Sequence, residues 1–269
     1  MKTLRTMREI RQVLEPLRAE RTVGLVPTMG AFHEGHLSLF RAARAENDVV
    51  VASLFVNPAQ FGASEDFAAY PRDEEQDARI AEDAGVDFLF APPGEELYPP
   101  GFQTWVDVEA LSRKLEGEHR PGHFRGVATI CLKLFNIVRP QRAYFGRKDA
   151  QQVAVVKRLA RDLDLDVEIR VVPTVRDADG LASSSRNAYL SALERERALA
   201  LPRALEAGAA AYRAGGDPIA AARAALNGLE PDYVEILELD GERLLAAAVR
   251  AGRTRLIDNV SLEGATHDT

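Results

Sequence analysis

Strand-like and helix-like segments alternate along the first two-thirds of the chain. The strand-like segments are runs of β-branched and apolar residues, whereas the helix-like segments repeat their apolar residues every three or four positions. The predicted strands are 22–28, 48–56, 86–92, 142–146 and 166–175, and the predicted helices are 36–46, 73–85, 126–138 and 149–163. This alternation predicts an α/β fold with a mainly parallel sheet covered by helices.

The pattern changes after about residue 175. A polar, serine-rich stretch follows, of the kind that forms connecting loops. Beyond it, Ala-rich helical patterns cover 192–215 and 217–229, and alternating patterns cover 232–240 and 254–262. Asp217 and Pro218 suit the N-cap and the first position of the second helix. We expect the strands to form a small antiparallel sheet, and therefore two domains, residues 1–175 and residues 176–269.

Composition narrows the range of partners. With 269 residues, 46% hydrophobic and 28% charged, the chain is ordinarily globular. Its net charge of −7 argues against broad electrostatic binding of nucleic acid, although backbone amides and a few cations can still bind an anion locally. Cys131 is the only cysteine, and its apolar neighbours predict a small buried hydrophobe. Without a membrane-spanning run or a signal-peptide core, we expect a cytoplasmic protein.

The stretch "MGAFHEGH", residues 29–36, places two of the five histidines three residues apart, directly after a predicted strand. In a parallel sheet, this is the edge where ligands bind. Gly30 and Gly35 let the backbone approach a ligand closely, and the helix that follows would offer free amides to an anion. His36, expected in the first turn of that helix, can stabilise negative charge that develops on a leaving pyrophosphate.

Other interpretations of these histidines remain open on the residues alone. A histidine at a helix start can simply cap the helix or face water. A zinc site is disfavoured, because "HEGH" lacks the spacing of H-E-x-x-H and no cysteine or third histidine is nearby.

Polar groups follow two further predicted strands. Residues 146–149, "GRKD", place two cations after a glycine, which suits a polyanion as well as an exposed turn. Asn57 and Gln60 follow the strand 48–56, and Gln152 opens the helix after "GRKD". Such amides can hydrogen-bond a carboxylate or a hydroxyl.

A third candidate loop is "DGLASSSRN", residues 179–187. Its serines and Arg186 offer donors to phosphate, and Gly180 permits motion, yet serine-rich stretches are usually only linkers. In combination with an HxGH loop, the stretch is typical of enzymes that activate a group by attack on the α-phosphate of ATP.

The motifs together resemble those of the pantoate–β-alanine ligase family, the pantothenate synthetases. The resemblance runs from residue 4 to residue 260. It rests on "VPTMGAFHEGH", "FVNPAQFG", "YPRD", "LEGEHRPGHFRGVATICLKLFNIVRP", "FGRKDAQQ", "VPTVRDADGLASSSRNAYL" and "TRLIDN". It implies ATP-dependent condensation of pantoate with β-alanine through an enzyme-bound pantoyl adenylate, with release of pyrophosphate and AMP, on the way to coenzyme A. It also implies Mg²⁺, a Rossmann-like N-terminal domain, a smaller α+β C-terminal lid domain and a homodimer.

The resemblance assigns roles to residues. The expected catalytic residues are His36, His33 and Lys148. ATP is expected to contact Met29, Gly30, Ala31, Phe32, His33, Glu34, Gly35, His36, Gly146, Arg147, Lys148, Asp149, Val175, Ser183, Ser184, Ser185 and Arg186. Gln60 and Gln152 are expected to hold pantoate, with Gln60 also near β-alanine. Acidic residues such as Asp77 could touch Mg²⁺, but phosphates and water can supply much of its coordination, so no metal ligand is assigned.

Some positions depart from the family pattern or have no assigned role. The family usually has Met or Leu at Ser183, Met at Ala59 and Glu at Arg147. Ser183 would place a polar group near the nucleotide, and Ala59 would loosen the pantoate pocket. His119 and His123 are expected to make structural hydrogen bonds.

Two alternative functions remain open. A nucleotidyltransferase of the same superfamily would stop at a stable nucleotidyl product, and a nonenzymatic nucleotide sensor would retain only the fold. The residues whose joint retention argues against a sensor are His33, His36, Lys148, Ser184, Ser185 and Arg186.

Overall fold

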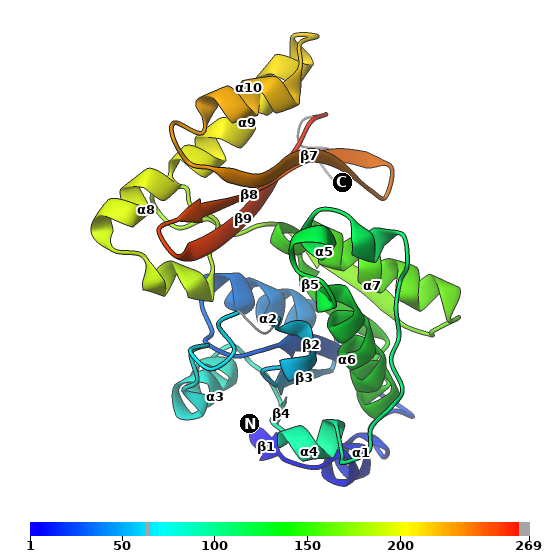
Figure 1. Cartoon of the computed structure of the whole chain (residues 1–269). Coiled ribbons are helices and arrows are strands. Elements are labelled where there is room, and N and C mark those ends of the chain that lie inside the picture. Colours follow the sequence, from blue (N-terminus) through cyan, green and yellow to red (C-terminus); the bar gives the residue numbers. More distant parts are fainter. Residues whose placement is uncertain (63–64, 264–269) are drawn as a thin grey trace. The chain divides into compact units, whose positions relative to one another are not determined.

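The computed structural model describes residues 1–62 and 65–263, and the chain divides into two compact units (Figure 1). The first unit comprises Met1–Arg147 and Val155–Pro173, and the second comprises Lys148–Ala154 and Thr174–Thr269. Each unit has its own sheet.

Six parallel strands form the sheet of the first unit, in the order β1-β4-β3-β2-β5-β6. Their bounds are β1 Lys2–Leu4, β2 Val23–Thr28, β3 Val49–Leu54, β4 Phe88–Phe90, β5 Arg142–Gly146 and β6 Glu168–Val172. Leu25 of β2 is in register with Val51 of β3 and with Ala143 of β5. β2 and β3 are buried over nearly their whole lengths, because a parallel sheet is covered on both faces. The predicted parallel sheet is confirmed.

Helices cover both faces of this sheet. The helices that begin in the first two-thirds of the chain are α1 Met7–Leu14, α2 Glu34–Glu46, α3 Glu74–Asp83, α4 Gly94–Leu97, α5 Glu116–His119, α6 His123–Val138 and α7 Ala150–Asp162, with 3₁₀ turns η1 Pro58–Gln60, η2 Leu111–Arg113 and η3 Arg147–Asp149. α2 follows β2 on the way to β3, whereas α6 lies on the connection that steps back across the sheet from β4 to β5. Because such crossovers are right-handed, α2 and α6 lie on opposite faces.

The strand order reverses at β2. From β2 the chain passes to β3 on one side, while β5 is the neighbour of β2 on the other side. In open α/β sheets, ligands bind outside the carboxyl ends of the strands at such a reversal. A ligand-binding site is therefore expected at the loops that follow β2 and β5.

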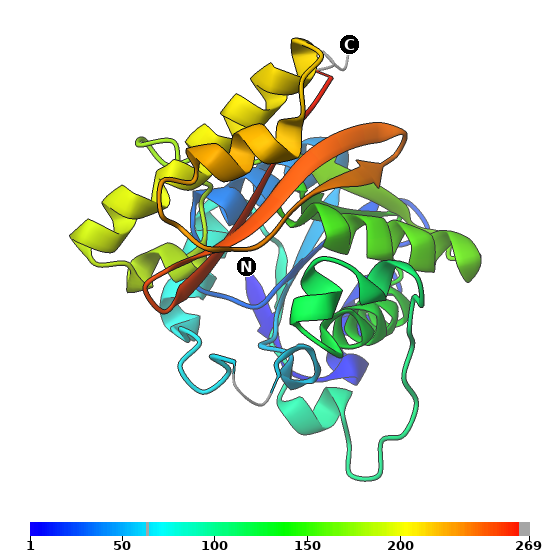
Figure 2. The same ribbon diagram turned by 45° about the horizontal axis from the view of Figure 1, so that its top comes forward.

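Three antiparallel strands form the sheet of the second unit, in the order β7-β8-β9. The elements of this unit are η4 Ser185–Tyr189, α8 Ala192–Ala198, α9 Ala200–Arg213, α10 Pro218–Ala225, β7 Pro231–Leu239, β8 Glu242–Ala251 and β9 Thr254–Ser261. Figures 1 and 2 show α9 and α10 lying together along the sheet. Leu201 and Leu205 of α9 and Leu245 and Val249 of β8 belong to one buried apolar cluster. Asp217 and Pro218 begin α10 as predicted.

One prediction for this unit was wrong, and one strand was missed. The single helix expected over 192–215 is two helices, α8 and α9, which meet at Leu199. Pro202 lies in the first turn of α9, and without an N–H it cannot extend the hydrogen-bond ladder of α8. β8 was not predicted at all, although it is the central strand. Its sequence, "ERLLAAAVRA", is rich in alanine, which is uncommon in strands.

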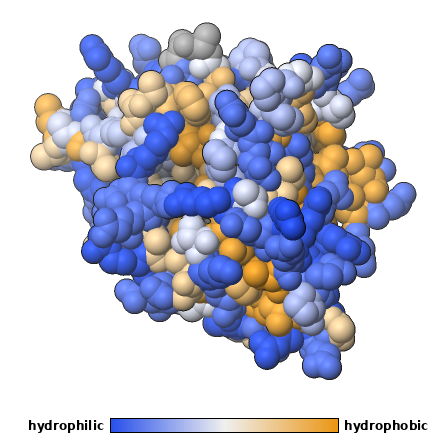
Figure 3. Space-filling model, turned by 90° about the horizontal axis from the view of Figure 1, so that it is seen from below, coloured by the Kyte–Doolittle hydropathy of each residue, from blue (hydrophilic) through white to orange (hydrophobic). Residues whose placement is uncertain are grey.

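The surface mixes hydrophilic and hydrophobic side chains. On the face in Figure 3, hydrophobic side chains gather in patches among hydrophilic ones. The exposed large hydrophobic residues are Phe67, Trp105, Leu163, Tyr189, Leu193 and Ile236. Within residues 1–62 and 65–263, no helix has the length and apolar character needed to cross a bilayer. Cys131 is buried as predicted, and its burial raises the pKa of the thiol to about 12.

Candidate functional site

The loop between β2 and α2 is held by the carboxylate of Asp77, on α3. The backbone N–H groups of Ala31 and Phe32 donate to Asp77 Oδ2 and Oδ1 at 2.8 and 2.7 Å. Asp77 is only 3% exposed. Burial raises the pKa of its carboxyl, and the two N–H donors oppose that rise. Asp77 therefore fixes the loop, a role different from the contact with Mg²⁺ considered from the sequence.

Gly30 allows this close approach. Its φ is +92°, and a Cβ at this position would lie 2.6 Å from Leu54 Cδ1 and 2.8 Å from Asp77 Oδ2. Ala31 also has a positive φ, 53°. A non-glycine residue held in this region costs about 1–3 kcal/mol, which the bonds to Asp77 offset. The strained turn brings the histidines directly to the carboxyl end of β2.

His33 and His36 share the start of α2. His33 is the N-cap, and its Nδ1 accepts the Gly35 N–H at 3.1 Å. The Nδ1 of His36 accepts the His33 N–H at 3.3 Å, and the two ring centroids are 4.2 Å apart. A ring nitrogen that accepts a hydrogen bond carries no proton, so the proton of each neutral imidazole is on Nε2. Each ring therefore caps the helix through Nδ1 and carries on Nε2 a proton that it can donate to an anionic oxygen.

Several amides at the start of α2 are used inside the loop, because the Gly35 N–H donates to His33 Nδ1 and the N–H groups of His36 and Leu37 donate to the His33 carbonyl. The loop caps its own helix. These three amides are therefore engaged, and the imidazoles are further groups of this loop that are suited to donate to a phosphate.

Gln60 ends the η1 turn after β3. Its Oε1 accepts from Asn57 Nδ2 at 3.0 Å, and its Nε2 lies 3.1 Å from Met29 Sδ. Backbone groups fix the orientation of the Asn57 amide, because Oδ1 accepts the Ala59 N–H and Nδ2 donates to the Gly126 carbonyl. The side-chain oxygen of Gln60 therefore accepts a hydrogen bond within the turn, and its NH₂ group points toward Met29, at the start of the histidine-bearing loop.

β5 ends at Gly146, and the turn that follows it begins with Arg147 in the first unit and continues with Lys148 in the second. Within the second unit, the Lys148 carbonyl accepts from Asn259 Nδ2 at 2.9 Å. Burial raises the pKa of the neighbouring Asp258, while its ion pair with Arg176 at 2.7 Å and the charge of Lys148 oppose the rise. The backbone at Lys148 is thus tied to β9.

Asp177 organises the serine-rich loop of the second unit. It accepts from Ser183 Oγ, from Asn187 Nδ2 at 3.1 Å and from Arg195 Nη2 at 2.7 Å. Burial alone would raise the pKa of Asp177, but these three donors lower it. Ser183 is 5% exposed, and its bond to Asp177 gives this buried hydroxyl a partner. Ser184 caps η4 by accepting the Arg186 N–H.

The predicted site residues fall on both units. Those of the first unit are Met29 to His36, Gln60, Gly146 and Arg147; those of the second are Lys148, Asp149, Gln152, Val175 and Ser183 to Arg186. Within the first unit, the structure brings the start of the histidine-bearing loop to the Gln60 turn through the contact of Met29 with Gln60. Sequence reasoning named Asp77 only as a possible Mg²⁺ contact and missed that its buried carboxylate holds the loop.

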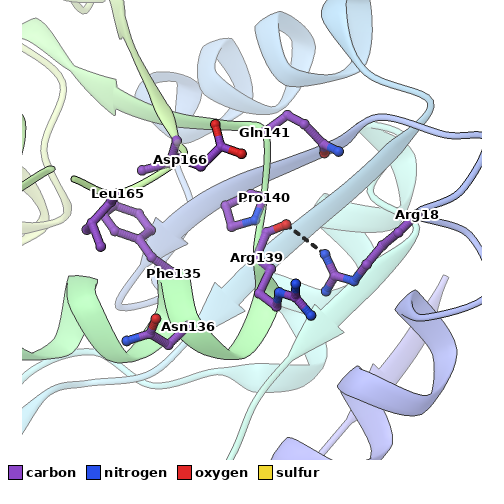
Figure 4. Close-up of a pocket in the computed structure, with 9 residues that line it drawn as sticks. Arg18, Phe135, Asn136, Arg139, Pro140, Gln141, Leu165 and Asp166 are labelled. Carbon is purple, nitrogen blue, oxygen red and sulfur yellow. Dashed lines mark hydrogen bonds between the residues drawn. The ribbon is translucent and has the colours of Figure 1, made fainter. Parts of the chain in front are cut away.

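A cavity of about 390 Å³ lies near the amino ends of β5 and β6 in the first unit (Figure 4). It is lined by Arg18, Phe135, Asn136, Arg139, Pro140, Gln141, Leu165, Asp166 and Val167. Arg18 donates to the Arg139 carbonyl at 2.7 Å, and the Gln141 side chain accepts from the Val23 N–H at the amino end of β2. The histidine-bearing loop follows the carboxyl end of β2, so this cavity is separate from the candidate site.

The fold and the site define a Rossmann-like α/β protein with a histidine-bearing loop at the reversal of its strand order. A family model described as pantoate-beta-alanine ligase matches residues 2–261. The pantothenate synthetase of Moorella thermoacetica is 52% identical over 280 residues, covering 98% of this chain and 99% of that protein.

Two solved structures agree with this match. The pantothenate synthetase from Thermus thermophilus superimposes with a TM-score of 0.92 at 47% identity, covering 97% of this chain and 99% of that one. The pantoate-beta-alanine ligase from Francisella tularensis, complexed with beta-gamma ATP and beta-alanine, gives a TM-score of 0.85 at 35% identity, covering 98% and 99%. The chain belongs to the pantoate–β-alanine ligase family, whose members make pantothenate.

Proposed function

We propose that this chain condenses pantoate with β-alanine through an enzyme-bound pantoyl adenylate, releasing pyrophosphate and AMP. The observation that carries the proposal is the pair His33 and His36, whose Nδ1 atoms accept backbone N–H groups and whose protons are therefore on Nε2. Two fixed donors at the ligand-binding edge of a parallel sheet suit the phosphates of ATP. The solved relative from Francisella tularensis, which is complexed with beta-gamma ATP and beta-alanine, supports the same substrates.

In the first step, a carboxylate oxygen of pantoate attacks the α-phosphorus of ATP. The bond from this phosphorus to the bridging oxygen breaks, and the electron pair leaves with pyrophosphate. His36 and His33 donate from Nε2–H to the oxygens on which this charge develops, and one such donor is worth roughly 2.7–4 kcal/mol. Lys148 adds a positive charge to the phosphate site, an assignment that rests on the family resemblance.

In the second step, the amine of β-alanine attacks the acyl carbon of the adenylate. The amide bond forms, AMP leaves with the electron pair of the acyl–oxygen bond, and the amine loses a proton. The order of steps is chemically sensible because a carboxylate is a poor electrophile and AMP is a far better leaving group than oxide. Gln60, whose NH₂ group is directed out of its turn, would donate to pantoate, and Gln152 would assist it.

Mg²⁺ belongs to the proposal as the ion that accompanies ATP. Among residues 1–62 and 65–263, no three His, Cys, Asp or Glu side chains form a group that could hold a metal ion. Mg²⁺ commonly keeps several waters and binds substrate phosphates, so the proposal assigns it no protein ligand. A homodimer and a cytoplasmic location also belong to the proposal, and sedimentation of the purified chain tests the dimer.

Product analysis tests the mechanism. With ATP, Mg²⁺ and pantoate but no amine, we expect about one equivalent of pyrophosphate per active site and a retained acyl adenylate, because no nucleophile is present to complete the reaction. With pantoate labelled by ¹⁸O in its carboxylate, the label should appear in AMP once β-alanine is added. Label in inorganic phosphate, with ADP as product, would instead mean an acyl-phosphate route and would refute the adenylate mechanism.

A further inference from the structure

His123, the first residue of α6, lies against the Gln60 turn. Its side chain is almost fully buried, and its Nδ1 is 2.9 Å from the Gln60 carbonyl oxygen, while its Nε2 is 3.2 Å from Arg120 Nη1. A carbonyl oxygen only accepts hydrogen bonds and a guanidinium only donates them. These two partners therefore fix one neutral tautomer, in which Nδ1–H donates to Gln60 and Nε2 accepts from Arg120.

Arg120 is itself held in place. Its Nε and Nη2 donate to the two carboxylate oxygens of Glu65 at 3.0 and 2.7 Å, a bidentate arrangement, and Nη2 also lies 3.4 Å from the Gln60 carbonyl. Burial, reinforced by the charge of Arg120, lowers the pKa of His123 to about 4. The imidazole is therefore neutral near pH 7, and Glu65, Arg120, His123 and Gln60 form one continuous hydrogen-bonded chain.

Gly126, one turn further along α6, supports the same η1 turn. A Cβ at Gly126 would lie 2.3 Å from the Ala59 carbonyl oxygen and 2.6 Å from the Gln60 nitrogen. The Gly126 carbonyl also accepts from Asn57. Positions three residues apart lie on the same side of a helix, so α6 holds the turn through a donated hydrogen bond at His123 and through direct backbone contact at Gly126.

We propose that His123 is a positioning residue that acts through the Gln60 carbonyl to aim the Gln60 NH₂ group at pantoate. The inference rests on the proposed role of Gln60 as a pantoate ligand. It assigns His123 a part in substrate affinity, beyond that of a structural histidine. Because His123 would act only through Gln60, its removal should raise the KM for pantoate and leave the KM for ATP unchanged.

Three substitutions separate this role from simple packing. His123→Leu removes both ring nitrogens. His123→Asn places an amide N–H near the position of Nδ1 and keeps the bond to Gln60, whereas His123→Gln reaches only the position of Nε2 and keeps the contact with Arg120. His119→Asn, at an exposed histidine in the same segment, is the matched control. The measurements are KM for pantoate and for ATP, and thermal unfolding of each variant.

We expect His123→Leu and His123→Gln to raise the KM for pantoate about tenfold, the effect of one lost positioning hydrogen bond, with KM for ATP unchanged. His123→Asn should restore pantoate affinity to within about threefold of wild type. In a Gln60→Ala background, His123→Leu should add no further increase, because the group that it positions is gone. If His123→Leu does not fold, the difference in KM for pantoate between His123→Asn and His123→Gln still tests the positioning role.

Several outcomes would overturn the inference. They are an unchanged KM for pantoate in a destabilised His123→Leu, equal behaviour of Asn and Gln, and additive effects with Gln60→Ala. Each of these would leave the proposed function intact as long as the wild-type chain makes pantothenate. A wild-type chain that makes no pantothenate from pantoate, β-alanine and ATP would refute the proposed function, and this inference with it.

Discussion

Replacing Asp77 by asparagine should release the histidine-bearing loop from α3. The carboxylate accepts the Ala31 and Phe32 N–H groups through its two oxygens. Asparagine has nearly the same shape but only one oxygen, so one of the two backbone donors would face the NH₂ group of the new side chain. Two donors in contact repel each other, and the turn at Gly30 and Ala31 would have to move.

The expected magnitude follows from these contacts. A hydrogen bond to a charged acceptor contributes about 1.5–3 kcal/mol, and a buried donor without a partner costs about 1–3 kcal/mol. The carboxylate of Asp77 is buried at a cost, visible as its raised pKa, and removal of that charge offsets part of the loss. We therefore expect the free energy of unfolding to fall by about 2 kcal/mol in Asp77→Asn.

Pyrophosphate release by Asp77→Asn should fall even at a temperature where the variant remains folded, because the histidines would be misplaced. A misplacement of about 1 Å can lower a rate about 100-fold, so we expect pantoate-dependent pyrophosphate release to drop at least about tenfold at a temperature where the variant is folded. Asp83→Asn, an exposed carboxylate on the same helix, is the control and should leave both quantities near wild type. Urea unfolding and a pyrophosphate-release assay measure the two effects. Wild-type stability and release in Asp77→Asn would refute the argument that this carboxylate fixes the loop.

Three further predictions concern single side chains. His36→Ala should lower adenylation at least about 100-fold with little change in unfolding temperature, and a half-active variant in the pyrophosphate assay would contradict the role of its Nε2–H. Lys148→Ala should also slow pantoate-dependent pyrophosphate release, whereas near-wild-type release would mean that its charge has no part in the first step. Because the pKa of His123 falls to about 4 on folding, the unfolded chain binds more protons between pH 4 and 6.5, so acidification from pH 7 to 4 should remove about 3 kcal/mol of stability. Urea unfolding across this pH range should give a flatter curve for His123→Asn, and equal slopes would count against a buried neutral imidazole.

The central strands could be predicted because their burial is reflected in a local run of mostly apolar residues. β2 and β3 are covered on both faces, so each appears as a mostly apolar run, and the predicted and observed bounds differ by at most two residues. β8 could not be predicted in this way. Its alanines favour a helix when considered alone, and only pairing with β7 and β9 on both sides makes them a strand.

Two residues that support the candidate site, Asp77 and His123, could not be assigned these roles from the sequence either. Asp77 lies 46 positions from Ala31, on a helix whose other acidic residues face solvent, and no local pattern separates the one buried carboxylate from its neighbours. The same holds for His123, whose value to Gln60 depends on a contact across 63 positions. Sequence motifs predict which groups touch substrate, whereas the groups that hold those side chains in place depend on contacts between distant parts of the chain.

The geometry of the histidine-bearing loop is compatible with both helix capping and the proposed phosphate binding. Spacing of three residues between the N-cap and N3 is that of a capping box, in which each side chain accepts a backbone N–H at the start of the helix. A serine and a glutamate at these positions would cap the helix equally well, but the glutamate would place a negative charge at the proposed phosphate site. Imidazole has two nitrogens, so it can accept a backbone N–H with Nδ1 and still donate with Nε2. Capping and phosphate binding are therefore not alternatives here, because the capping bond itself selects the tautomer that a phosphate requires.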